Sequence, residues 1–80
     1  MITARRKQIL EYIWEFYEDH SYMPSMREIG KGVGLKSTSS IEHHIIQLYL
    51  DGYLESEHNG RPRAFRLTDK YFKNRIDPDW

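Results

Sequence analysis

Polar side chains that can donate and accept hydrogen bonds gather in one short stretch of the chain, residues 36–47. They include hydroxyl, amide and imidazole groups, so the stretch is polar without being heavily charged. Groups of these types hydrogen-bond the edges of bases in the major groove of a duplex. We therefore expect this stretch to recognise the base sequence of a DNA duplex. The candidate residues are Lys36, Ser37, Thr38, Ser39, Ser40, Glu42, His43 and Gln47.

The histidines and serines lack the spacing of a metal site or a catalytic centre. His43 and His44 are adjacent, so on a helix their side chains point about 100° apart and cannot share an ion. His20 and His58 lie in expected connectors, without a cysteine or a helical partner at a ligand spacing. The serines of residues 37–40 are explained as helix caps and have no nucleophile elbow. We predict no enzymatic activity, no metal and no cofactor.

The first of two short helices that must position these groups has a clear start signal. Ser25 and Glu28 form an S-x-x-E capping box directly after Pro24. This pattern predicts a helix that begins near Met26 and ends by Gly34, where the backbone must reverse. We expect Arg27 on this helix to contact the DNA backbone.

The second helix begins in the hydroxyl cluster, where Ser37 is the favoured N-cap and Ser39 with Glu42 is an alternative capping box. One stripe of it is expected to be buried, because apolar residues recur about one turn apart at Ile41, Ile45 and Leu48. The polar groups lie on the other side. Two short helices joined by a tight turn with glycine are the pattern of a helix-turn-helix.

A longer helix is expected before this pair, capped by Thr3 and running to about Asp19. Its wide apolar stripe places Trp14 and Tyr17 in the core. The first turn carries three cations, which we expect to be solvated, with a phosphate contact as the alternative: Arg5, Arg6 and Lys7.

A strand, a tight turn and a returning strand are expected after the second short helix, at residues 53–57, 58–60 and 64–67. Leu54, Phe65 and Leu67 can face the core. The tip would project as a wing whose basic side chains contact phosphates, with Asn59, Arg61 and Arg63 as the candidates. The chain is therefore predicted to be mainly α with a small β-hairpin, a winged helix-turn-helix of three helices plus a two-stranded wing.

An ordered set of motifs resembles a known family. They are T-A-R-x-x-x-I-L, M-P-x-x-x-E-I, G-L-x-S, E-x-H and G-Y-L-E, spread in matching order over about Thr3 to Leu67. The set is similar to the N-terminal DNA-binding domain of the LexA repressor, a winged helix-turn-helix. That family also has a C-terminal peptidase and dimerisation domain, which these 80 residues do not include. The resemblance therefore implies DNA binding and does not imply autoproteolysis.

Composition limits the function classes. Eighty residues without cysteine predict one small domain whose fold depends on its core, and no long apolar run or signal peptide is present, so we expect a cytoplasmic protein. The net charge of +0 is unusual for a DNA-binding domain. The charges segregate, however, into an acidic stripe on the first helix and basic residues in the helix-turn-helix and hairpin. We expect the basic side to face phosphates.

The last part of the chain is expected to form a tail, residues 68–80, after a DNA-binding domain of residues 1–67. One option for the tail is a short helix of one or two turns that begins at Thr68-Asp69 and ends before Asp77-Pro78. Its apolar side chains, Tyr71, Phe72, Ile76 and Trp80, either fold back on the first helix or supply a dimer contact. The expected function is sequence-specific binding of double-stranded DNA by a bacterial or phage repressor or regulator, nucleoid-associated and paired as a homodimer on DNA. The alternative is a winged-helix protein-interaction module that does not bind DNA. No membrane or small-molecule partner is indicated.

Overall fold

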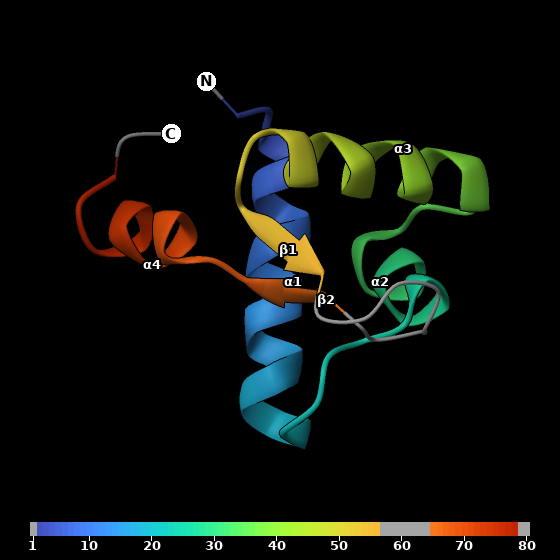
Figure 1. The fold of residues 1–80 in the computed structure, drawn as a ribbon. Coiled ribbons are helices and arrows are strands. Elements are labelled where there is room, and N and C mark those ends of the chain that lie inside the picture. The colour runs from blue at the N-terminus through green and yellow to red at the C-terminus, as the bar shows by residue number, and fades with distance from the viewer. Residues whose placement is uncertain (1, 57–64, 79–80) are drawn as a thin grey trace.

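A long N-terminal helix forms the central column of the fold, and the other elements pack around it (Figure 1). The computed structural model describes residues 2–56 and 65–78. Within those residues the elements follow in the order α1 (Ala4–His20), α2 (Met26–Val33), α3 (Thr38–Leu50), β1 (Leu54–Ser56), β2 (Phe65–Leu67) and α4 (Asp69–Ile76). The prediction of a mainly helical fold with a small two-stranded sheet is confirmed.

Helix α1 begins and ends where local hydrogen bonds satisfy its terminal groups. The Thr3 hydroxyl accepts a hydrogen bond from the backbone N–H of Arg6 at 3.2 Å, as expected for an N-cap. At the other end, Ser21 adopts a left-handed conformation, with φ 64°, and donates its N–H to the carbonyl of Tyr17. The buried face consists of Ile9, Leu10, Ile13 and Phe16.

The apolar stripe of α1 is wider than the face that the core covers. Tyr17 is 40% exposed, so its predicted place in the core is wrong. Its ring stacks beside Trp14, with centroids 6.1 Å apart, at the edge of the buried face. Trp14 itself is half-buried against the core and meets the ring of Phe72 edge-on at 5.2 Å. Periodicity found the apolar side of the helix, but the neighbouring elements determine how much of it is covered.

The hairpin closes over the core in a single antiparallel register. Leu54 pairs with Leu67 and Ser56 pairs with Phe65. Leu54, Phe65 and Leu67 are buried, which confirms the predicted inward positions. The expected turn, residues 58–60, lies outside the described residues.

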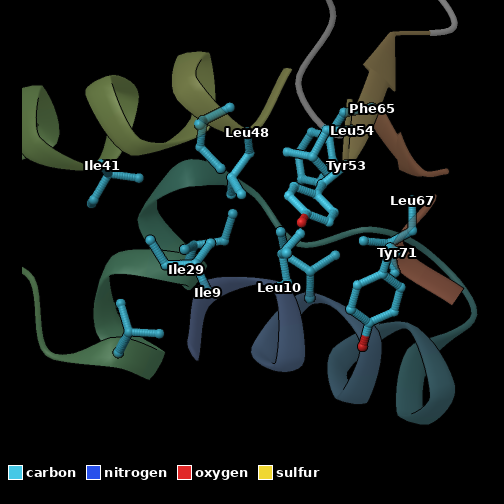
Figure 2. Close-up of a cluster of buried hydrophobic side chains, with 13 residues drawn as sticks. Ile9, Leu10, Ile29, Ile41, Leu48, Tyr53, Leu54, Phe65, Leu67 and Tyr71 are labelled. Atoms are coloured by element: carbon cyan, nitrogen blue, oxygen red, sulfur yellow. The ribbon is translucent and has the colours of Figure 1, made fainter. Parts of the chain in front are cut away.

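One hydrophobic cluster joins all of these elements (Figure 2). Its thirteen buried members are Ile9, Leu10, Ile13, Ile29, Val33, Ile41, Ile45, Leu48, Tyr53, Leu54, Phe65, Leu67 and Tyr71. Every helix and both strands contribute at least one side chain or contact it directly. A shared core of this kind fixes the helix-turn-helix against α1, because close-packed side chains resist relative movement.

Helix α4 folds back on α1, the first of the two placements that the sequence left open. Tyr71 is 1% exposed and belongs to the hydrophobic cluster. The side chain of Asn74, also buried, donates a hydrogen bond to the Tyr53 hydroxyl at 3.3 Å. The division of the chain into a DNA-binding domain of residues 1–67 and a separate tail stays a prediction. In the part of the chain that the structure describes, no helix is long and apolar enough to cross a membrane.

Candidate nucleic-acid interface

Helix α2 has the predicted capping box at its start. The Glu28 N–H donates to the Ser25 hydroxyl at 3.2 Å, and the Ser25 N–H donates to the Glu28 carboxylate at 2.8 Å. The helix ends at Gly34, whose φ of 76° lies in the left-handed region that favours glycine. The next N–H, of Leu35, donates to the carbonyl of Gly30 at 2.9 Å. The chain therefore reverses tightly and leads directly into α3.

A second glycine allows α2 and α3 to approach each other closely. Gly30 is buried, and a Cβ built on it would overlap the Cδ1 atom of Ile41 and lie 3.0 Å from the carbonyl oxygen of Leu35. Carbon atoms normally pack about 3.5 to 4.0 Å apart. The angle between the two helices of the pair therefore depends on the missing side chain at Gly30.

Helix α3 begins at the first of the two caps considered from the sequence. The Ser37 hydroxyl accepts a hydrogen bond from the N–H of Ser40 at 3.4 Å, and the helix starts at Thr38. At its other end, the N–H of Tyr53 donates to the carbonyl of Leu48 and that of Gly52 to the carbonyl of Tyr49, which is a Schellman motif. Gly52 has φ 84°, as its predicted role at the helix end requires.

The side of α3 that faces away from the core carries the polar groups selected from the sequence. Ile41, Ile45 and Leu48 are buried on the inner side, which confirms that stripe. Most of the selected groups are exposed and Gln47 is half-buried; the exposed ones are Lys36, Ser37, Thr38, Ser39, Ser40, Glu42 and His43. The fold thus brings the whole set together on α3 and the turn before it. Sequence reasoning missed two apolar residues on the same outer side, Ile46 and Leu50, although their helical spacing from His43 indicated it.

A basic cleft lies beside this surface, between α2 and the start of α3. Its volume is about 690 Å³, and its lining includes the side chains of Arg27, Lys31 and Lys36. Arg27 and Lys31 are exposed on α2. Thr38, the first residue of α3, also lines the cleft, so the N-terminus of that helix faces the same region. The lining residues that the structure describes combine three cations with apolar residues and include no acidic residue, and the cations suit a phosphate backbone.

The wing candidates cannot be placed in this surface, because Asn59, Arg61 and Arg63 lie outside the described residues. The remaining hairpin arginine, Arg66, is described. Its guanidinium forms an ion pair with the Glu55 carboxylate across the sheet, where the two residues face each other in register. Glu55 therefore offsets part of the positive charge that the sequence assigned to the hairpin.

The first turn of α1 holds the helix pair in place through two arginines. The Arg5 guanidinium donates to the carbonyl of Val33 at 2.5 Å, at the C-terminal end of α2, where a cation complements the helix dipole. The Nε of Arg6 donates to Nδ1 of His44 on α3 at 3.3 Å. The sequence predicted that these arginines are solvated or contact phosphates, and it did not predict these hydrogen bonds within the protein. Helices far apart in the sequence form them, so no local signal predicts them.

This arrangement disfavours the charged form of His44. Burial lowers the pKa of its imidazole, and the positive charge of Arg6 lowers it further, followed by His43 and Arg5. Its Nδ1 atom accepts the hydrogen bond from Arg6, so the proton of the neutral ring lies on Nε2. His44 thus serves as a structural acceptor between α1 and α3, while His43 one residue earlier faces outward.

Comparison with known proteins agrees with this geometry. The family described as LexA DNA binding domain matches residues 1–64. This chain belongs to that family. It is 36% identical over 77 residues to the LexA repressor of Streptomyces avermitilis, covering 96% of this chain and 32% of that protein. It is 44% identical over 77 residues to the LexA repressor of Frankia casuarinae, covering 95% of this chain and 30% of the relative.

The LexA-type chain spans about a third of the length of these curated relatives. The helix-turn-helix lies entirely within the matched residues, whereas β2 and the whole of α4 lie beyond the family match. Within residues 2–56 and 65–78 there is no group of three or more histidine, aspartate or glutamate side chains placed to hold a metal ion.

Proposed function

We propose that the domain reads a specific sequence of double-stranded DNA through the outer face of α3, and that it acts as a transcriptional repressor. The observation that carries the proposal is the exposed polar face of α3 beside a basic cleft, in a domain of the LexA DNA-binding family. In a helix-turn-helix, the second helix enters the major groove and the first crosses the backbone. Helices α3 and α2 take these parts here.

The two groups of side chains then have different tasks. Arg27 lies on α2, the helix that crosses the DNA backbone, so its contact positions the domain. On α3 and the turn before it, the polar groups face the base edges and discriminate between them; they are Lys36, Ser37, Thr38, Ser39, Ser40, Glu42, His43 and Gln47. A carboxylate accepts from the amino group of cytosine, whereas an amide suits adenine.

The wing completes the proposed interface, with Asn59, Arg61 and Arg63 at phosphates beside the half-site. This part rests on the sequence alone. Phosphate contacts carry little base information, so the wing adds affinity for all duplexes and makes binding more sensitive to salt.

A role as a protein-interaction module loses its main support. That alternative rested on the aromatic residues of the tail and on the acidic stripe of the first helix, but Tyr71 is buried in the core and Phe72 packs against it. The described part of the tail therefore offers less apolar surface to a partner than the sequence suggested. Ile76 is the exception, since it is exposed at the end of α4.

The proposal also covers how copies of the domain assemble on DNA and where they act. A single winged helix reads only a few base pairs, so two copies on two half-sites supply the discrimination that a repressor needs. We infer that the domain has a non-enzymatic role, that it pairs on DNA and that it acts in the cytoplasm, on the nucleoid of a bacterial or phage-infected cell.

Selection of binding sites from random duplexes tests this function directly. The chain should enrich a defined half-site, and Ser39→Ala, Ser40→Ala or His43→Ala should each change the preferred base, with a loss of about 1–3 kcal/mol where a base contact disappears. His20→Ala is the matched control, because His20 lies at the far end of α1 from α3 (Figure 1). Failure to enrich any sequence would refute sequence-specific binding. If all three variants keep the preference of the unaltered chain, the bases are not recognised by α3.

A further inference from the structure

Two large apolar side chains stand in solvent on the outer face of α3. Ile46 is 55% exposed and Leu50 is 74% exposed. The other large aliphatic residues of this helix, Ile41, Ile45 and Leu48, are buried on the inner side. Packing of the core therefore does not explain why these two positions carry large apolar side chains, since neither Ile46 nor Leu50 belongs to the hydrophobic cluster.

Ile46 continues the polar face along the helix. It follows His43 by three residues and Glu42 by four, so its side chain is next to theirs on the helix surface. It follows Ser39 by seven residues, which is about two turns, or roughly 10 Å along the axis. Ile46 thus points in nearly the same direction as Ser39 and lies one turn beyond Glu42 and His43, two of the proposed base-reading residues.

The major groove has one apolar group that such a side chain fits. Each base pair presents donors and acceptors there, and thymine alone adds a methyl group, at C5. A branched aliphatic side chain cannot hydrogen-bond a base edge, but it can shield this methyl group from water. Ile46 is continuous with the polar face of α3, so DNA is favoured over a protein as the partner that contacts it. Ile46 and its neighbours Glu42 and His43 would enter one groove together.

We propose that Ile46 contacts the 5-methyl group of a thymine and makes the domain prefer that base at one position of its half-site. The inference rests on the proposed function, in which α3 lies in the major groove. Leu50 lies about 16 Å from Ser39 along the helix axis, beyond the groove segment that the first turns of α3 occupy. It therefore serves as a matched apolar control on the same face.

Deoxyuridine in place of thymine provides the test, because it removes the methyl group and leaves the hydrogen-bonding edge unchanged. On the selected duplex, one such replacement should weaken binding by the intact chain about fourfold, the effect of one buried methyl-sized group. Ile46→Ala should bind the thymine duplex about as weakly as the intact chain binds the deoxyuridine duplex, and should no longer distinguish the two. Leu50→Ala should still distinguish them. Both residues are exposed and alanine favours helix, so both variants should fold, as circular dichroism will verify.

The outcomes separate this inference from the proposed function. If no thymine position responds to deoxyuridine, or if Ile46→Ala keeps the full response, the methyl contact is refuted while selected-site binding stands. If Leu50→Ala abolishes the response and Ile46→Ala does not, the assignment to Ile46 is wrong. If the chain selects no sequence at all, the proposed function fails and the inference fails with it.

Discussion

Replacing Gly30 by alanine tests how closely the two helices of the helix-turn-helix approach each other. Two effects of opposite sign compete. Alanine is the better helix former, and the exchange stabilises a helix interior by about 0.5–1 kcal/mol. The new Cβ, however, would overlap the buried Ile41 side chain and lie 3.0 Å from the Leu35 carbonyl oxygen.

The packing effect should be the larger one. Inserting a methyl group into a close-packed core costs about 1–3 kcal/mol, and here one of the two obstructing groups is backbone, which cannot rotate away. The net expectation is a loss of about 1 kcal/mol in the free energy of unfolding. For a domain of this size, that lowers the melting temperature by about 4–8 °C.

Gly32 provides the matched control, because it lies in the same helix and gains the same propensity on exchange for alanine. Its added Cβ would overlap the ring of Tyr12 even more closely than the Cβ at Gly30 would overlap Ile41, but the three nearest atoms all belong to one partly buried side chain that can turn, and none of them is backbone. Gly32→Ala should therefore lose less stability than Gly30→Ala. Thermal unfolding of both variants, followed by far-ultraviolet circular dichroism, gives the comparison. A Gly30→Ala variant as stable as the unaltered domain would contradict the close approach of α2 and α3.

Three further outcomes are expected. Tyr71→Ala should lower the free energy of unfolding by about 3–5 kcal/mol in urea titrations, since Tyr71 is a large core side chain; a loss near zero would remove α4 from the core. The folded state lowers the pKa of His44 below its ordinary value of 6.5, so the unfolded chain binds more protons there. Stability should be full above about pH 6.5 and fall as the pH drops toward the lowered folded pKa, and His44→Gln should flatten this slope in the urea midpoint. Replacing both Arg61 and Arg63 by alanine should make the salt dependence of DNA binding shallower by about one to two units, and an unchanged slope would exclude the wing from the interface.

Local signals predicted most of the helix-turn-helix. The capping box of Ser25 and Glu28, the cap at Ser37 and the left-handed glycines at positions 34 and 52 all act over a few residues of chain. The buried stripe of α3 follows from helical periodicity in the same way. Interactions of this range involve only neighbouring residues, so the sequence alone determined where α2 and α3 begin and end, and which side of α3 is buried.

Only the tertiary structure decided which residues meet across the fold. Arg5 and Val33 are 28 residues apart, Arg6 and His44 are 38 apart, and Tyr53 and Asn74 are 21 apart. Each pair forms because two elements cross at a particular angle, which packing of the shared core sets and no short motif records. The exposure of Tyr17 and Ile46 has the same origin: apolar residues tend to be buried, but the neighbouring elements determine which of them are covered.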